Sequence, residues 1–140
     1  VLIEDYYQIS KIKKKNYDMI ISVSACNPFL DEKDIIKAIK LFKKNKGKFQ
    51  ILCVSKYNSV IERSFKINSG ILSYNNKKNI LKRSQDFSNS YYDNDSFMIT
   101  NINLLKNYHK SKFIPYIIPS YRGIDINNPE DLVFAKKLIN

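Results

Sequence analysis

The order of apolar and polar residues between positions 17 and 57 constrains the fold more than any other feature of this sequence. The run "YDMIISVSA" (Tyr17–Ala25) has the length and composition of a strand buried on both faces. A loop, "CNPFL", follows it, and Asp31 then stands at the N-cap position of a helix that contains "IIKAIKLF". "FQILCVSKY" (Phe49–Tyr57) is a second buried strand. This β-α-β order predicts a parallel sheet with a right-handed crossover.

The rest of the chain adds shorter elements to this unit. "VIERSFKI" and "GILSY" flank an Asn-Ser-Gly turn at 68–70, where glycine admits positive φ, so they predict a β-hairpin. A long polar connection (Leu81–Phe97) leads to a strand, "SFMIT" (Ser96–Thr100), a short helix, "NINLLKNY", and another strand, "FIPYIIPS". A last helix begins after Asn128 as N-cap, with Pro129 as its first residue. The predicted fold is α/β, mostly parallel, with a β-hairpin insertion and with ligands beyond the carboxyl ends of the strands.

Length and composition narrow the class of protein. The 140 residues correspond to a single domain, and no apolar run is long enough to span a membrane. The start has neither the basic flank nor the apolar core of a signal peptide, and it lacks a methionine, so we expect a cytoplasmic protein that is processed or a fragment. Cys26 and Cys53 have no metal-site spacing and are expected to be small buried residues in a reducing compartment. His109 is alone, which excludes a histidine metal cluster or a serine triad, and is expected at the surface.

The net charge of +11 has two interpretations. It is typical of proteins that bind nucleic acid or a membrane surface. However, 21 of the 24 basic residues are lysine, and A+T-rich codons alone could produce that bias. "KIKKKNY" (Lys11–Tyr17) and "FKKNKGK" (Phe42–Lys48) are expected as solvated helix ends, and the charge is expected to be spread through such lysine-rich ends. The sequence therefore predicts neither a specific nucleic-acid partner nor a membrane.

The residues that could carry chemistry are arginines and carboxylates. Because the chain otherwise uses lysine, the three arginines, Arg63, Arg83 and Arg122, could together hold an acidic ligand in their planar forks, or each could form a structural ion pair. Asp125 follows the last strand and could hold Mg²⁺ beside a phosphate, or could serve the turn before the capped helix. The remaining candidates for a polyol or metal are Asp86, Asp93 and Asp95.

Taken together, the motifs resemble one enzyme family. "VSACNPFLDEKDIIKAIKLF", "VIERSFKINSGIL", "RSQDFSNSYYDNDSF" and "GIDINNPEDLVFAKKL" resemble, in order and spacing, the pseudaminic acid cytidylyltransferases, which belong with the CMP-sialic acid synthetases. The resemblance implies a Rossmann-like nucleotidyltransferase fold. It also implies transfer of CMP from CTP to a nine-carbon 2-keto acid with Mg²⁺ and release of pyrophosphate. The anomeric hydroxyl of the sugar would attack the α-phosphate, so the protein mainly positions the reactants and neutralises charge.

The resemblance also assigns residues by position. "ACNPF", with Asn27, matches the family loop near the nucleotide, and Asp125 and Asn127 match the family's Asp-Ile-Asp metal motif. The substrate-side matches are Arg63, Arg83, Ser84, Gln85, Asp86, Tyr92 and Asp93. Tyr92 stands where relatives usually have histidine, and Asp95 replaces a usual glycine. Asn127 replaces the second acid, which should lower metal affinity because an amide brings no negative charge.

A Gly-rich basic loop for the CTP triphosphate is not visible among the three glycines, Gly47, Gly70 and Gly123. We therefore expect an N-terminally truncated fold that begins about a third of the way into the family's. One hypothesis is the C-terminal part of an active cytidylyltransferase, and the second is a non-catalytic remnant that folds as a homodimer. A basic nucleic-acid-binding domain is the third.

Overall fold

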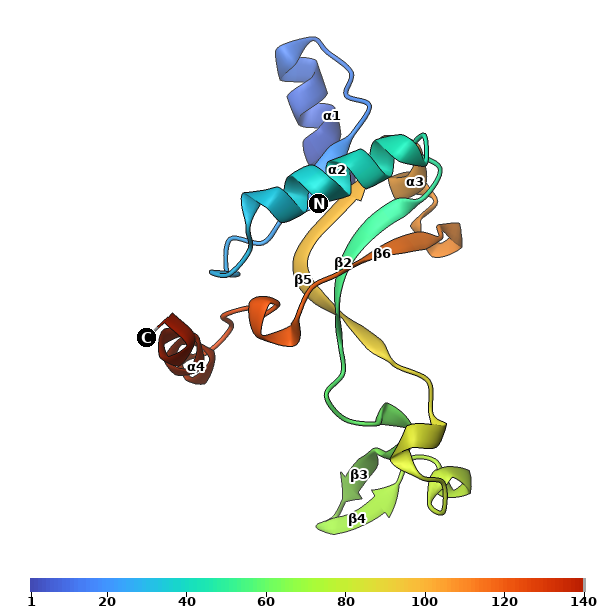
Figure 1. Ribbon diagram of the computed structural model, residues 1–140. Coiled ribbons are helices and arrows are strands. Elements are labelled where there is room, and N and C mark those ends of the chain that lie inside the picture. The colour runs from blue at the N-terminus through green and yellow to red at the C-terminus, as the bar shows by residue number, and fades with distance from the viewer. Residues whose placement is uncertain (140) are drawn as a thin grey trace.

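The computed structural model describes residues 1–139 (Figure 1). Helices and strands follow in the order α1 (Leu2–Lys13), β1 (Ile20–Val23), α2 (Glu32–Lys44), β2 (Gln50–Lys56), β3 (Phe65–Asn68), β4 (Ile71–Tyr74), β5 (Tyr91–Thr100), α3 (Ile102–Lys106), β6 (Phe113–Ile117) and α4 (Pro129–Ile139). Short 3₁₀ turns connect several of them. None of the helices described is long and apolar enough to cross a bilayer.

The main sheet has four strands in the order β1-β5-β2-β6. β5 is antiparallel to both of its neighbours, and only β2 and β6 pair in parallel. The fold is α/β as predicted, but a mostly parallel sheet is wrong, since two of the three strand interfaces are antiparallel. The crossover from β1 through α2 to β2 leaves one position free between the two strands. The chain fills that position with β5, which enters from the far end after the hairpin and so runs the opposite way.

Helix α2 covers one face of this sheet and forms the core (Figure 1). Asp31 caps it as predicted, because its carboxylate accepts a hydrogen bond from the Lys33 amide at 2.8 Å. Ala38 and Phe42 of α2 are almost fully buried against Ile51, Cys53, Phe97, Ile99 and Ile118. Burial raises the pKa of the Cys53 thiol to about 11, so this cysteine is an inert core residue.

The predicted hairpin is present and projects from the sheet as a separate arm (Figure 1). Ser69 and Gly70 both have positive φ, 50° and 78°, which is the backbone of a tight two-residue hairpin turn. Phe65 stacks on Tyr74 across the two strands, with ring centroids 4.3 Å apart. Ile67 and Ile71 are about 70% exposed, so the arm presents apolar side chains to solvent.

Strand β5 is twice as long as the sequence indicated. The segment 91–95, expected as irregular connection, is part of the strand and pairs with β2 from Val54 to Lys56. A register shift between Leu52 and Val54 interrupts the ladder, and Asp95 has a φ of 55° there. This β-bulge places extra residues in β5, and the polar segment 91–95 remains paired with β2 beyond it.

The C-terminal helix has the cap that its sequence predicts. Asn128 accepts a hydrogen bond from the Asp131 amide at 2.9 Å, and Asp131 accepts in return from the Asn127 and Asn128 amides. Pro129 is the first helical residue. His109 is exposed, as predicted. The prediction that Cys26 is buried is wrong: this residue is exposed because it lies in the loop that follows β1.

Candidate functional site

The candidate site lies at the carboxyl ends of β1 and β6, where the loops after the two strands meet. Ser24 donates a hydrogen bond to Asp125 Oδ1 at 3.0 Å, and Asn127 donates to Asp125 Oδ2 at 2.7 Å. The Ser24 hydroxyl also accepts from the Cys26 amide at 3.1 Å, and the Ile126 amide donates to the Cys26 carbonyl at 3.0 Å. Asp125 is therefore held in one orientation by groups from both loops.

Two more carboxylates, Asp93 and Asp95 on β5, belong to this region. The pKa of Asp95 is raised, first because the carboxylate is partly desolvated and then because Asp93 and Asp125 place negative charge near it. The Asp95 amide donates to Asp93 Oδ1 at 3.0 Å, which keeps the two residues together at the bulge. The structure thus concentrates negative charge at the carboxyl end of the sheet.

The side-chain oxygens near Asp125 can be compared with the ligands that the predicted magnesium ion needs. Residues 1–139 contain no group of three or more His, Cys, Asp or Glu side chains arranged to hold a metal by themselves. Mg²⁺ commonly binds through one or two protein carboxylates and completes its shell with phosphate oxygens and water. The repulsion that raises the pKa of Asp95 is relieved by a nearby cation. The residues present are therefore compatible with Mg²⁺ held mainly by Asp125, with the Asn127 amide oxygen as a neutral ligand.

Asn27 lies under this region and is used within the fold. It is 8% exposed; its side-chain amide donates to the Ser96 hydroxyl, and its oxygen accepts from the Phe29 amide at 3.0 Å. These bonds tie the loop after β1 to β5. The side chain that the resemblance places near the nucleotide therefore shapes the loop, and the backbone around it faces the site.

Arg122 forms a structural ion pair. Its guanidinium binds Asp34 at the start of α2 and donates to the Phe29 carbonyl at 3.1 and 3.3 Å. Burial raises the pKa of Asp34, but hydrogen bonds from Arg122 and from Tyr116, 2.9 Å away, outweigh it and hold the pKa below its ordinary value. The prediction that all three arginines share an acidic ligand is therefore wrong for Arg122, because its guanidinium already binds Asp34 and the Phe29 carbonyl.

The other two arginines lie at the base of the hairpin arm. Arg83 binds Asp86 through its side chain at 3.2 and 3.4 Å, and its amide donates to the same carboxylate. Arg63 donates to the Ser84 hydroxyl at 3.3 Å, and Gln85 lies exposed on the same 3₁₀ turn. Since the Arg83 side chain is 73% exposed, a ligand carboxylate could reach its guanidinium.

Tyr92 and Asp93 connect the two groups along β5. Tyr92 packs on Tyr57 with ring centroids 4.9 Å apart, and the neighbouring Asp93 is exposed. Successive side chains of a strand point to opposite faces, so these two residues are not presented to one ligand by the strand itself. The predicted site residues therefore form an acidic group around Asp125 and a separate polar group around Arg83.

Sequence reasoning missed Ser24 as the partner of Asp125. The two residues are 101 positions apart, and the contact depends on which strands become neighbours. The local signal is the serine that ends the apolar run of β1 just before the loop.

None of the three glycines lies where a triphosphate loop would be needed. Gly47 follows α2 at the opposite end of the sheet, and Gly70 forms the hairpin turn. Gly123 packs so closely on Ser55 and Asn94 that an added Cβ would lie 2.7 Å from each side chain. The described residues therefore supply no Gly-rich cradle for phosphate.

Comparison with known proteins supports the fold. The crystal structure of 4-diphosphocytidyl-2C-methyl-D-erythritolsynthase from Anaerococcus prevotii superposes with a TM-score of 0.52 and 14% sequence identity, over 94% of this chain. The matched part is 64% of that enzyme's chain, so the present chain spans less than two thirds of its length. No protein-family model and no curated protein matches the sequence. At this identity the likeness shows only that the overall fold of the chain is like that of this synthase.

Proposed function

We propose that the chain belongs to a cytidylyltransferase that transfers CMP from CTP to a nonulosonic acid of the pseudaminic or sialic type. The observation that carries the proposal is the cytidylyltransferase-like fold with Asp125, Asp93 and Asp95 gathered at the carboxyl end of its sheet. Ligands of open α/β sheets bind at that end. The resemblance of four sequence segments to the pseudaminic acid cytidylyltransferases supports the sugar acid as acceptor.

In this proposal Asp125 and Asn127 hold Mg²⁺, whose chemistry is neutralisation of the charge on the phosphates of CTP. Ser24 and Asn127 fix the rotamer of Asp125 through the bonds to its two oxygens. A carboxylate fixed in this way needs no reorganisation when the charged substrate arrives. The protein's contribution is therefore positioning.

The polar group at the base of the arm would hold the sugar acid. Arg83 is proposed for the carboxylate of the substrate and would exchange its exposed bond to Asp86 for it. Hydroxyl and amide groups of the sugar would be recognised by Arg63, Gln85, Asp86 and, from β5, by either Tyr92 or Asp93, because the strand points these two side chains to opposite faces.

The experiment is a CMP-transfer assay with radiolabelled CTP, Mg²⁺ and a panel of nonulosonic acids. It uses the 140-residue chain and, where the gene encodes more, the longer chain. Product formation that depends on a nonulosonic acid and disappears in Asp125→Asn supports the proposal. CTP binding without transfer to any acid by either chain would instead favour a non-catalytic remnant of this fold, and turnover by the 140-residue chain would exclude the remnant.

A homodimer stays a prediction, and the exposed apolar arm is the feature that favours it. Sedimentation of the wild type and of Ile67→Lys, which places a charge in the arm, tests it. A monomer at all concentrations would contradict this part of the proposal.

A further inference from the structure

The positive charge of this chain is concentrated in three segments. Residues 11–18, 42–49 and 101–112 contain eleven lysines and one acidic residue, Asp18, and so carry a formal charge of +10. The other 112 residues contain 13 basic and 12 acidic residues and account for only +1 of the net +11. A codon bias toward lysine would spread the lysines along the chain, so it does not explain this distribution.

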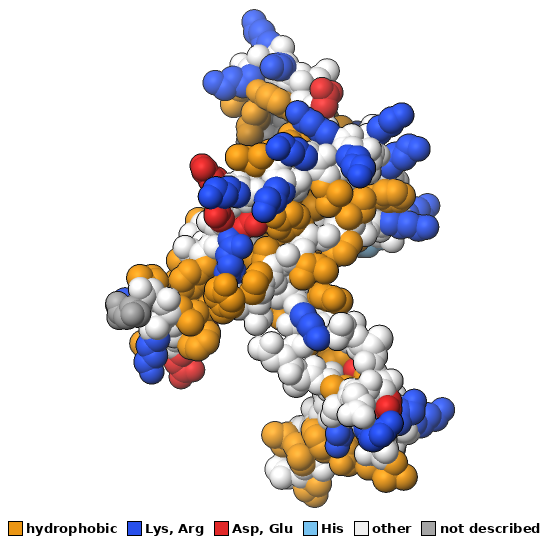
Figure 2. All heavy atoms as spheres, viewed as in Figure 1, with side chains coloured by type: hydrophobic (Ala, Val, Ile, Leu, Met, Phe, Trp, Pro, Cys, Tyr) orange, Lys and Arg blue, Asp and Glu red, His pale blue; other side chains and the backbone are white. Residues whose placement is uncertain are grey.

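The fold brings the three segments together. They precede β1, β2 and β6 and follow β5, which places all of them at the amino end of the three co-directional strands. Asn101 donates to the Gly47 carbonyl at 3.0 Å, and the Gln50 amide donates to the Lys112 carbonyl at 3.2 Å. Figure 2 shows most of the blue side chains over α1, α2 and the α3 end of the molecule. The lysine-rich helix ends that the sequence predicts therefore gather at one end of the sheet, and we call this surface the lysine end.

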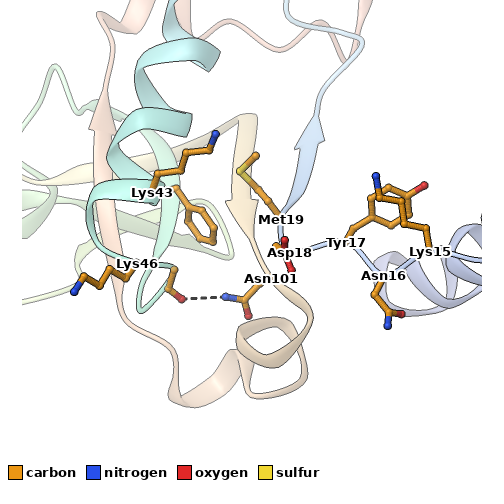
Figure 3. A pocket seen from close by; sticks show the side chains of 10 residues that line it. Lys15, Asn16, Tyr17, Asp18, Met19, Lys43, Lys46 and Asn101 are labelled. Atoms are coloured by element: carbon orange, nitrogen blue, oxygen red, sulfur yellow. Dashed lines mark hydrogen bonds between the residues drawn. The ribbon is translucent and has the colours of Figure 1, made fainter.

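The surface of the lysine end is hollowed. A cavity of about 590 Å³ lies between the end of α2 and the segment after α1, with Lys43 and Lys46 on one side and Lys15 on the other (Figure 3). A second hollow of about 420 Å³ shares Asn16, Tyr17, Asp18 and Asn101 with the first. A third, of about 430 Å³, shares Asn103 with the second and is lined by Lys48, Lys110 and Lys112. Neighbouring hollows share lining residues, and we call the three together the groove.

The lysines of this groove are free to bind a ligand. The ion pairs found among residues 1–139 involve the N-terminus, Arg83 and Arg122 but none of the lysines. Two aromatic rings line the hollows beside these lysines: Tyr17 lies beneath Lys15 and Tyr7 beneath Lys106, and Tyr7 is 48% exposed. Interleaved cations and exposed rings in a groove fit a phosphodiester chain whose bases stack on the aromatic rings.

We propose that the lysine end binds single-stranded nucleic acid without sequence preference. Lysine supplies point charges for phosphates, and the chain has no arginine there to read base edges through a bidentate fork. The surface is concave, which favours a strand over a flat anionic membrane. This departs from the sequence-based expectation of no nucleic-acid partner.

The lysine end is distinct from the candidate site. β2 runs between the two ends, and its seven residues span about 20 Å. Binding at one end does not require the other, so the proposal does not rest on the proposed transfer activity.

The test is fluorescence anisotropy with labelled rU20 and dT20, which distinguish RNA from DNA as the source of the strand. The test variant is the exposed trio Lys15→Gln, Lys43→Gln and Lys46→Gln. A matched control, Lys66→Gln, Lys77→Gln and Lys78→Gln on the arm, removes the same three charges elsewhere. Urea midpoints establish that both variants fold.

With five phosphate contacts, the logarithm of the wild-type affinity should fall with the logarithm of salt at a slope near −3.5, which is about 100-fold between 50 and 200 mM. The test trio should reduce the slope by about 2 and lower the affinity about 100-fold at 100 mM salt, while the control trio changes the affinity less than about threefold. Equal losses in the two trios would overturn the proposal, because the charge would then act diffusely. Binding to phosphatidylserine vesicles with none to either oligonucleotide would overturn it in favour of a membrane.

Discussion

Replacing Arg122 with glutamine should destabilise the fold by about 3 kcal/mol. The side chains of Arg122 and Asp34 are only 24% and 9% exposed, so the substitution leaves a largely buried carboxylate without its cation. It also removes both donors to the Phe29 carbonyl. Breaking a buried pair costs about 3–5 kcal/mol. We expect the lower end of that range because Tyr116 still donates to Asp34 and a quarter of Arg122 already faces water.

Arg83→Gln is the matched control. It removes the same guanidinium from another arginine–aspartate pair, Arg83–Asp86, whose side chains are 73% and 41% exposed. Water screens such a pair, and its loss costs about 0–0.5 kcal/mol. The two substitutions are chemically identical, so any difference between them reports burial.

Urea unfolding followed by circular dichroism measures both variants. With a slope of about 1.5–2 kcal/mol per molar urea, the midpoint should fall by about 1.5–2 M for Arg122→Gln and by less than about 0.3 M for Arg83→Gln. Equal shifts would refute the reasoning. The lowered pKa of Asp34 means that the stability from the pair is present above the unfolded-state value near 3.8 and is lost as the pH falls through the folded-state pKa. The stabilities of the wild type and Arg122→Gln should therefore approach each other as the pH falls from about 3.8 through the lower folded-state pKa of Asp34.

Three further substitutions test other parts of the structure. Arg83→Lys keeps the positive charge but loses the planar guanidinium fork. In steady-state kinetics of an active chain it should raise KM for the sugar acid and leave KM for CTP nearly unchanged. An unchanged KM for the sugar acid would mean that the loop containing Arg83 has only a structural role. Asp95→Asn should raise the urea midpoint at pH 7. Burial, Asp93 and Asp125 all raise the pKa of Asp95, so the charged carboxylate weakens the fold once the pH exceeds the folded-state pKa. The gain in stability from Asp95→Asn should therefore vanish near pH 3. Gly123→Ala places a Cβ 2.7 Å from two buried side chains and should cost about 1–3 kcal/mol, whereas little loss would mean that the loop relaxes freely.

Local chemistry made much of this fold predictable. The Asp31 cap, the Asn128 cap with Pro129 behind it, and the hairpin turn at 69–70 all depend on contacts within a few residues. The direction of β5 was not predictable in this way. Whether a strand fills the position between β1 and β2 depends on the whole chain, and the polar sequence of β5 hid a strand that a bulge keeps in the sheet.

In the candidate site, too, contacts between residues close in sequence were predictable and contacts that depend on strand order were not. Asp125 and Asn127 are two residues apart, and their contact follows from the turn that holds them. The contact of Ser24 with Asp125 joins the ends of two strands, and the assembly of the lysine end requires the order of all four. Arg122 was ambiguous in the sequence because an arginine before a turn fits either a ligand or an ion pair. Only the position of Asp34 at the start of α2 decides it.

The opposite charges of the two ends of the sheet lead to opposite expectations for magnesium. At the carboxyl end the ion would offset the repulsion among Asp93, Asp95 and Asp125, so 5 mM Mg²⁺ should strengthen the binding of CTP to an active chain. At the lysine end Mg²⁺ competes with lysine for phosphate, so the same addition at constant ionic strength should weaken the binding of rU20.

Titrations of both ligands against one protein preparation measure the two responses, with Asp125→Asn as the control that should lose only the first. A common direction for the two ligands would mean that CTP and the strand share one surface, and the assignment of separate ends would then be wrong. Opposite directions, with the Asp125 variant changed for CTP alone, are what the opposite charges of the two ends of the sheet require.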